Sequence, residues 1–286
     1  MCDRGWEYFV LKRGKGLLGL AGLGKERLEA LYRSCNCRKY VHPDPLEFLY
    51  PCSDPGDREL VGLIASSLAY GRVAQILKSV STVLEPMGPS PRAFLRRSSP
   101  DALKSLYRTF KHRFSTGEEL VSLLLGARDV LDDYGSLEEC FHAGLGSQDD
   151  TIFPALCAFV KALGVSGNGP PNSLLPLPER GSACKRLNLY LRWMVRQDDV
   201  DPGGWNRIPL SKLIIPLDTH MHKISVATGF TRRRQADMRT AIEVTRAFQR
   251  FSPEDPVRYD FVLTRLGIRE DMDLNQFLRE YRSCPI

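Results

Sequence analysis

Hydrophobic residues recur at helical spacing through most of the chain, and the alternation that is typical of β-strands is almost absent. Between residues 57 and 84 this pattern is interrupted at Gly71, which predicts two helices with a break at residues 70–72. Further helices are predicted at 116–134, after Ser136, and at 149–163, 182–196, 219–228, 235–251, 256–266 and 273–282. The chain is therefore predicted to be all-α, with about a dozen helices joined by short links.

Local polar signals place several of these helix ends. Thr116 is followed three residues later by Glu119, which is the pattern of a capping box, and Ser136 with Glu139 repeats it. Segments rich in glycine, proline and short polar residues predict loops at 164–178 and 197–205.

Composition is that of an ordinary soluble globular protein. The 286 residues are 43% hydrophobic and 26% charged, enough for one large domain or two lobes. A net charge of +6 suits a polyanionic partner without identifying one. No stretch approaches the ~20 apolar residues of a membrane span, and the apolar run at 17–23 is too short and glycine-broken for a secretory signal. We expect a cytoplasmic protein, in a bacterium associated with the nucleoid, with no membrane partner.

The eight cysteines are scattered, and no CxxC pair occurs. Cys35 and Cys37 have no companions at a usual zinc spacing, so the cysteines are expected to be reduced thiols and no metal site is predicted. His220 and His222 are two positions apart on a predicted helix and point to different faces, so we do not expect them to share a metal ion.

Asp218 follows a hydrophobic run and precedes a helical pattern, which predicts that it caps the helix N-terminus. Capping also anchors the carboxylate, which could then activate a nucleophile or stabilise a developing positive charge. Lys185, further upstream, is the candidate nucleophile because an amine can attack a sugar carbon and form a Schiff base. A solvated lysine on a helix surface is the plainer interpretation of the same residue.

Residues 216–220, Pro-Leu-Asp-Thr-His, with the later Thr228-Gly229-Phe230, resemble the aspartate motif of the helix-hairpin-helix DNA glycosylases. Residues 63–72 are similar to the first core helix of that superfamily, and residues 259–267 to a late helix ending in Leu-Gly. The superfamily's hairpin usually reads Leu-Pro-Gly-x-Gly with a lysine two residues later. Here residues 177–181 keep Leu-Pro and one glycine, and Lys185 lies four residues beyond it.

Within this superfamily the chain resembles endonuclease III and, in its lysine-to-aspartate interval, the archaeal 8-oxoguanine glycosylases. It looks most like a conserved, uncharacterised bacterial family marked by residues 40–45, 189–196 and 216–220. Only Cys284 lies near the C-terminus, so the iron–sulfur cluster of some members is not expected, and no cofactor is predicted.

The resemblance implies a two-lobed glycosylase-like fold with a divergent hairpin. A terminal lobe would combine residues 25–59 and 216–286, a central bundle would span 60–215, and residues 1–24 would form an extension. Lys185 would be the Schiff-base nucleophile and Asp218 its activating carboxylate, at the junction of the lobes.

The resemblance also implies a base-excision glycosylase, with or without AP-lyase activity, acting as a monomer on a damaged base flipped out of duplex DNA. Expected DNA contacts are Arg180, Gly181, Ser182, Arg186, Arg192, His220 and His222, and the expected base pocket is Tyr70, Gly71, Arg72 and Trp193. The arginines at 232–234 and 196 are further candidates for the DNA groove, and Trp205 for stacking on the base.

Three alternatives remain open at this stage. A monofunctional glycosylase would use Asp218 to activate water and Lys185 only to contact phosphate. A non-catalytic nucleic-acid-binding protein could have kept the fold alone. An enzyme acting on a small nucleoside is the third, although it would not need an extended basic surface.

Overall fold

The computed structural model describes residues 24–165 and 172–268. Most of these residues lie in helices, and the strands form a small two-stranded antiparallel sheet. The predicted all-α character is therefore confirmed. The helix predicted at 273–282 lies outside the described residues.

The elements of the first part of the chain are mainly short helices. The α-helices are α2 (Lys25–Cys35), α3 (Pro55–Ser67), α4 (Val73–Leu84), α5 (Pro91–Arg97), α6 (Pro100–Leu106), α7 (Gly117–Tyr134), α8 (Leu137–Ala143) and α9 (Phe153–Val160). Shorter helical turns are η1 (Arg38–Tyr40), η2 (Pro45–Leu49), η3 (Glu85–Met87) and η4 (Lys161–Val165), and the strands are β1 (Lys111–His112) and β2 (Ser115–Thr116).

The second part of the chain is also helical. Its elements are η5 (Pro178–Arg180), α10 (Lys185–Val195), η6 (Leu210–Lys212), α11 (Thr219–Ala227), α12 (Met238–Gln249) and α13 (Asp260–Ile268).

The helix ends that were predicted from nearby residues at Gly71, Thr116 and Ser136 are confirmed. A break separates α3 from α4, and Gly71 within it has φ +101°, a conformation that suits glycine. The Thr116 hydroxyl accepts the Glu119 N–H, and the Glu119 carboxylate accepts the Thr116 N–H at 2.9 Å, which completes the capping box of α7. Ser136 likewise caps α8.

Helix α2, the helices α5 and α6, and the β1–β2 hairpin were not predicted. Pro91 and Pro100 each begin a seven-residue helix, α5 and α6. Proline suits the first helical position because its missing N–H has no intrahelical partner there, and Ser90 and Ser99 supply the caps. The strands of the β1–β2 hairpin are two residues long, too short to show alternation.

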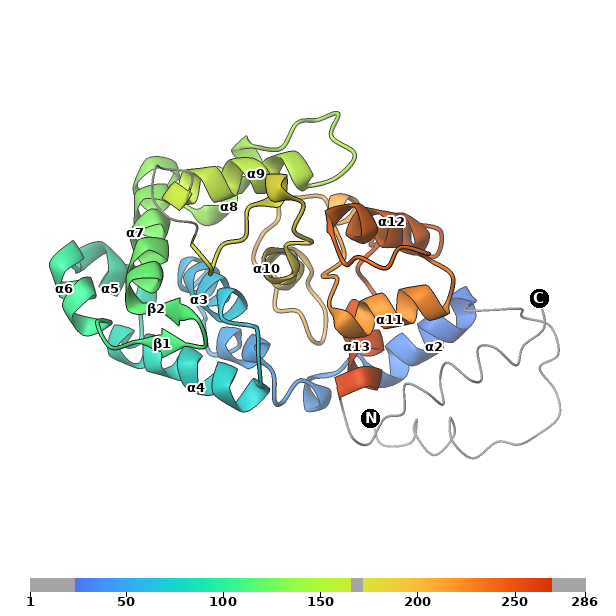
Figure 1. Ribbon diagram of the computed structural model, residues 1–286, viewed down its shortest axis with the longest axis horizontal. Helices are drawn as coiled ribbons and strands as arrows, with labels where there is room; N and C mark the ends of the chain where they lie inside the picture. The colour runs from blue at the N-terminus through green and yellow to red at the C-terminus, as the bar shows by residue number, and fades with distance from the viewer. Residues whose placement is uncertain (1–23, 166–171, 269–286) are drawn as a thin grey trace.

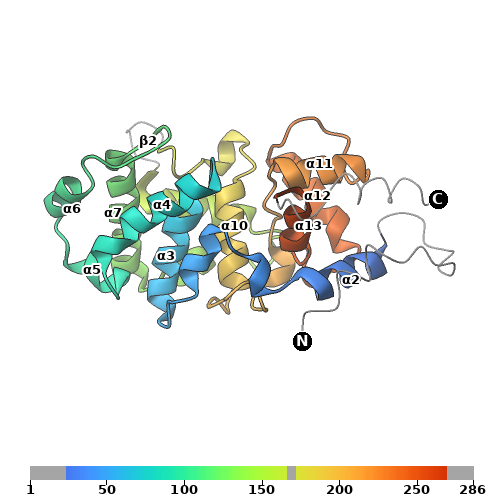
Figure 2. The ribbon, with the colours of Figure 1, turned by 90° about the horizontal axis from the view of Figure 1, so that it is seen from below.

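Helix α10 lies between two groups of helices (Figures 1 and 2). On one side are α3 to α9, and on the other are α2, α11, α12 and α13, so the N-terminal helix joins the C-terminal ones. Nearly every residue of α10 from Leu187 to Val195 is buried, which makes it the centre of the molecule. The expected lobe boundary at residue 59 falls inside α3.

Gly126→Ala is expected to destabilise the fold by about 1–3 kcal/mol or more. A Cβ at Gly126, in the middle of α7, would lie 2.0 Å from the main-chain oxygen of Leu163, so backbone would have to move. Chemical denaturation would measure the change. Ser122→Ala, at an exposed position of the same helix, is the matched control and should not lower stability. Equal stability of both variants would contradict the tight approach of α7 to η4.

Candidate active site

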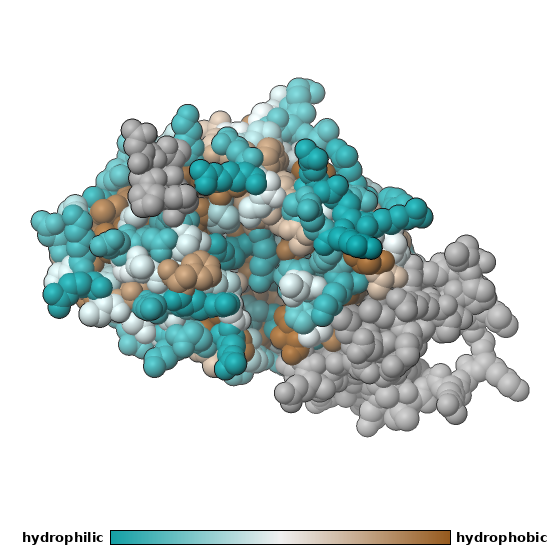
Figure 3. Space-filling view, viewed as in Figure 1, coloured by the Kyte–Doolittle hydropathy of each residue, from teal (hydrophilic) through white to brown (hydrophobic). Residues whose placement is uncertain are grey.

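A cavity of about 800 Å³ lies beside the first turn of α10. Its wall brings together the break between α3 and α4, the starts of α4, α10 and α11, the end of α13 and the segment before η2. This volume is within the range of about 300–1,000 Å³ that is typical of small-molecule sites. Hydrophilic side chains cover most of the face seen in Figure 3, with hydrophobic ones scattered among them.

Lys185 is the first residue of α10 and is half-buried in the cavity wall. The chain reaches it through a left-handed Gly181 (φ +82°) and a left-handed Cys184 (φ +47°), a conformation uncommon for a residue other than glycine. The Lys185 ammonium donates to the main-chain oxygen of Ala69 at 3.5 Å, next to the break between α3 and α4. The lysine is therefore positioned at the cavity and is not on a solvated helix face.

Asp218 caps α11, as predicted. Its Oδ1 accepts the main-chain N–H of Met221 at 2.7 Å, and the hydrophobic run at 213–217 that precedes it is buried. The side chain is half-buried and lines the same cavity as Lys185. Among the residues that the structure describes, no ion pair within 4.0 Å joins the two side chains. The candidate nucleophile and the candidate carboxylate thus line one cavity.

Arg186 forms part of the wall and is mainly a structural anchor. Its guanidinium donates to the main-chain oxygens of Ser67 at 2.7 Å and Ser173 at 2.5 Å, and it lies 4.8 Å from the ring centre of Tyr70. Burial lowers the pKa of this guanidinium from its ordinary value. Both amino groups of Arg186 therefore already donate to main-chain oxygens. Few of its N–H groups are left for the DNA phosphate contact that was predicted.

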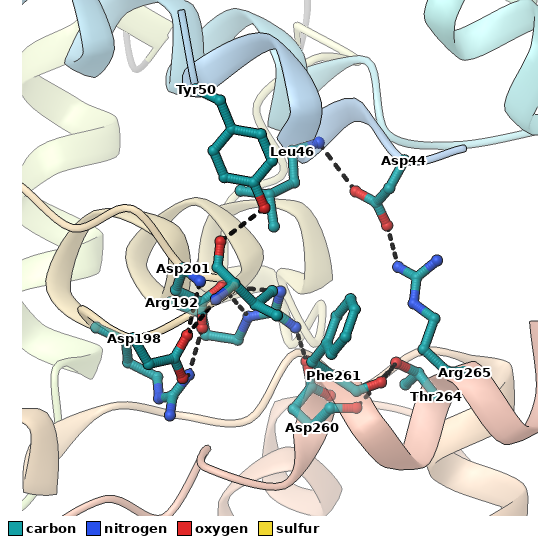
Figure 4. Close-up of polar contacts among 12 residues, drawn as sticks. Asp44, Leu46, Tyr50, Arg192, Asp198, Asp201, Asp260, Phe261, Thr264 and Arg265 are labelled. Carbon is teal, nitrogen blue, oxygen red and sulfur yellow. Dashed lines mark hydrogen bonds and ion pairs between the residues drawn. The ribbon is translucent and has the colours of Figure 1, made fainter. Parts of the chain in front are cut away.

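The predicted roles of Arg192 and Trp193 are wrong. Trp193 is fully buried and cannot stack on a base, and Arg192 is 4% exposed and cannot reach DNA. Arg192 instead pairs with Asp201 at 3.1 Å and with Asp260 at 2.5 Å (Figure 4). The physical reason is that α10 is covered on all sides, so its polar positions face other elements and not solvent.

Two further candidates are also buried. Arg196 pairs with Asp198 at 2.8 Å and Asp255 at 3.0 Å, so it does not line a DNA groove. The indole of Trp205 donates to Glu59 at 2.7 Å in the core, so it does not stack on a base.

Asp260 lies behind the cavity, in this same buried network. Burial raises the pKa of its carboxyl to about 6, the paired Arg192 opposes that rise, and the negative charge of Asp218 adds to it. Asp260 is therefore close enough to Asp218 for the two carboxylates to interact electrostatically, which places the buried network near the capping carboxylate.

The segment before α10 lies partly on the surface. Arg180, Gly181 and Ser182 are exposed, and Ser182 also lines the cavity. The main chain of Gly181 accepts the N–H of Met238 at 3.1 Å, which ties this segment to the start of α12. The N–H of Gly181 is bonded to the Pro178 oxygen, so it is not free for a phosphate.

The two histidines of α11 do point to different sides. His220 lines the cavity and packs against Gly267 of α13, where a Cβ would lie 2.3 Å from its Nδ1. His222 makes a 2.9 Å hydrogen bond with the main-chain oxygen of Arg233 and is not part of the cavity wall.

The predicted base pocket is brought together in part. Tyr70 and Gly71 line the cavity, whereas Arg72 is exposed before α4 and does not. The Tyr70 hydroxyl donates to the His112 oxygen at 2.9 Å and lies 2.6 Å from the Ser115 hydroxyl, so the β1–β2 hairpin fixes the ring. The ring also packs against Arg186 and Phe114, so its place in the cavity wall is fixed.

Sequence reasoning missed Asp44 and Arg265, which also line the cavity. Asp44 stands before Pro45, a pattern that indicates a helix cap, and it does cap η2. Nothing local could have shown that residues 221 positions apart would pair across this cavity.

Comparison with protein families gives one match. The model of DUF2400, described as a protein of unknown function, matches residues 44–269. The chain belongs to this family. The matched segment includes Lys185, Asp218 and every residue named above for the cavity wall. Neither the curated proteins nor the solved structures contain a match. In the described part of the chain, no helix is both long and apolar enough to cross a membrane.

Proposed function

We propose that this chain is a base-excision DNA glycosylase in which Lys185 is the nucleophile and Asp218 the stabilising carboxylate. The observation that carries the proposal is that these two residues, far apart in the sequence, line one cavity of about 800 Å³. Tyr70 adds an aromatic ring to the same wall. The resemblance of residues 63–72, 177–185 and 216–220 to helix-hairpin-helix glycosylases supports a glycosylase-like fold with a divergent hairpin.

The cavity suits a base that has left the DNA stack. The C1′ atom and the base edges of a paired nucleotide are inaccessible in duplex DNA, so the damaged nucleotide must rotate into a pocket. Tyr70 would border the base, and Lys185 and Asp218 would flank the sugar.

In the proposed reaction, the Lys185 nitrogen attacks C1′ as the glycosidic bond breaks, and the bonding electron pair leaves with the base. The nitrogen gives up one proton to the departing base and, as the sugar ring opens, a second to the ring oxygen, which leaves a Schiff base. Asp218 stabilises the positive charge that develops at C1′. Elimination of the 3′ phosphate from the Schiff base would then cleave the strand, giving AP-lyase activity.

The deciding experiment is borohydride trapping, in which the imine is reduced to a stable amine. The full chain would be incubated with duplexes and single strands that carry 8-oxoguanine, uracil, alkylated bases or an abasic site. A protein–DNA adduct is expected on at least one substrate. Absence of any adduct, with base release intact, would indicate the monofunctional enzyme in which Asp218 activates water. Absence of both would leave a nucleic-acid-binding protein.

Arg180→Ala is expected to weaken binding to DNA uniformly across sequences, because an exposed arginine next to the cavity-lining Ser182 would contact phosphate. The slope of log affinity against log salt concentration should become shallower by about 0.9, the value for one phosphate contact. Fluorescence anisotropy with an abasic duplex would measure it.

The matched control is Arg97→Ala, at an exposed arginine on α5 that is not part of the cavity wall. It should leave the slope unchanged. Equal slopes for wild type and Arg180→Ala would remove residues 180–182 from the proposed DNA surface.

A further inference from the structure

A second carboxylate, Asp44, lines the cavity that holds Lys185 and Asp218. Like Asp218 it is a helix cap: its Oδ1 accepts the main-chain N–H of Leu46 at 2.9 Å, at the start of η2. Its Oδ2 accepts a hydrogen bond from Arg265 of α13 (Figure 4). The cavity therefore contains two carboxylates from different elements, and only Asp218 has a part in the proposed chemistry.

Arg265 holds Asp44 rigidly in place. The arginine side chain is 5% exposed, and its guanidinium lies 4.6 Å from the ring centre of Phe261. Within the described part of the chain, Asp44 accepts from this guanidinium and the Nε has no acceptor. The Asp44 carboxylate is consequently preorganised before any ligand enters.

Asp44 retains unused capacity to accept hydrogen bonds. A carboxylate offers about four lone-pair sites, and the contacts with Leu46 and Arg265 occupy two of them. The side chain is 19% exposed and faces a cavity, so its remaining lone pairs are available to a ligand with N–H groups. A ligand edge that carries only acceptors would be repelled by the same oxygens.

We infer that Asp44, held by Arg265, recognises N–H donors on the edge of the extruded base. This inference rests on the proposed function, because it takes the ligand of the cavity to be a nucleotide. It favours bases with adjacent N–H groups, such as purines of the guanine type, which carry a ring N–H beside an exocyclic amino group. Asp44 would be a specificity-determining residue, and Lys185 and Asp218 would carry out the reaction at the sugar.

Asp44→Asn tests this inference because an asparagine keeps the cap of η2 but replaces one acceptor by a donor. The full chain would be assayed for base release from a duplex containing 8-oxoguanine and for cleavage of an abasic duplex, which has no base to recognise. We expect kcat/KM for base release to fall by about 5- to 150-fold, as expected for loss of one good base contact. Cleavage of the abasic duplex should stay within about twofold of wild type, because the sugar chemistry does not involve Asp44.

Asp54→Asn is the matched control. Asp54 caps α3 by accepting the Asp57 N–H at 2.9 Å, and it does not line the cavity. It should leave both activities unchanged. If Asp44→Asn lowered base release and abasic cleavage equally, or changed neither, the inference would be overturned in favour of a purely structural ion pair.

A second measurement changes the substrate. Removing the exocyclic amino group from the base, by replacing 8-oxoguanine with 8-oxohypoxanthine, should lower kcat/KM of the wild-type protein, and this dependence should be smaller in Asp44→Asn. Equal release of both bases by the wild type would overturn the inference. Cleavage of abasic DNA without release of either base would overturn it as well while leaving the proposed lyase function standing. If the abasic duplex were also left intact, the proposed function itself would fail.

Discussion

Lys185→Gln is expected to lower the yield of the borohydride-trapped adduct by about three orders of magnitude or more, to background. Glutamine is a polar, unbranched residue with a helix propensity close to that of lysine, so the start of α10 should fold normally. Its amide nitrogen cannot form an imine with C1′, so the covalent intermediate is lost. The measurement is the adduct yield on the substrate that the wild-type protein traps best.

The control for Lys185 is Lys223→Gln, at an exposed lysine on α11 that is not part of the cavity wall. It should trap DNA as the wild type does. An undiminished adduct with Lys185→Gln would assign the nucleophile to another amine. Loss of the adduct with base release preserved would instead support the monofunctional enzyme.

Asp218→Asn is expected to slow base release by about 10²- to 10⁴-fold, the range typical of a positioned catalytic carboxylate. Asparagine caps a helix about as well as aspartate, so the bond to the Met221 N–H and the stability of α11 should be kept. What is removed is the negative charge beside the sugar. Single-turnover base release measures the chemical step, and thermal unfolding checks the fold.

Asp54→Asn again serves as the control, because it removes the charge of a helix cap that lies outside the cavity. It should leave the rate unchanged. A rate for Asp218→Asn within about twofold of wild type would mean that Asp218 is a structural cap alone, and the catalytic proposal would fall.

The local signals in the sequence were sufficient wherever one helix end decides the outcome. The capping box of Thr116 and Glu119, the cap at Asp218 and the break at Gly71 each depend on residues within a few positions of one another. Hydrophobic periodicity likewise predicted the positions of most helices. It missed α2, and it missed α5 and α6 because each of those two is seven residues long, too short for a periodic pattern to stand out.

Burial on α10 could not be read from the same pattern. Arg192, Trp193 and Arg196 stand at helical spacing with apolar neighbours, and an arginine on such a helix normally faces solvent. In this molecule α10 lies at the centre, and aspartates from the 198–201 loop and from the segment at 255–260 neutralise the two arginines. Those partners come from other elements, so only the packing of the whole chain assigns the arginines to the interior.

The sequence by itself determined the helical class, most helix ends and the residue types able to do the chemistry, because these depend on short-range spacing and capping. The tertiary structure alone decided which of those residues meet. It placed Lys185 and Asp218 on one cavity, added Asp44 and Arg265 to its wall, and buried Arg192 and Trp193. The reason is physical: contacts between distant segments follow from how helices pack to bury their apolar faces, which no single stretch of sequence specifies.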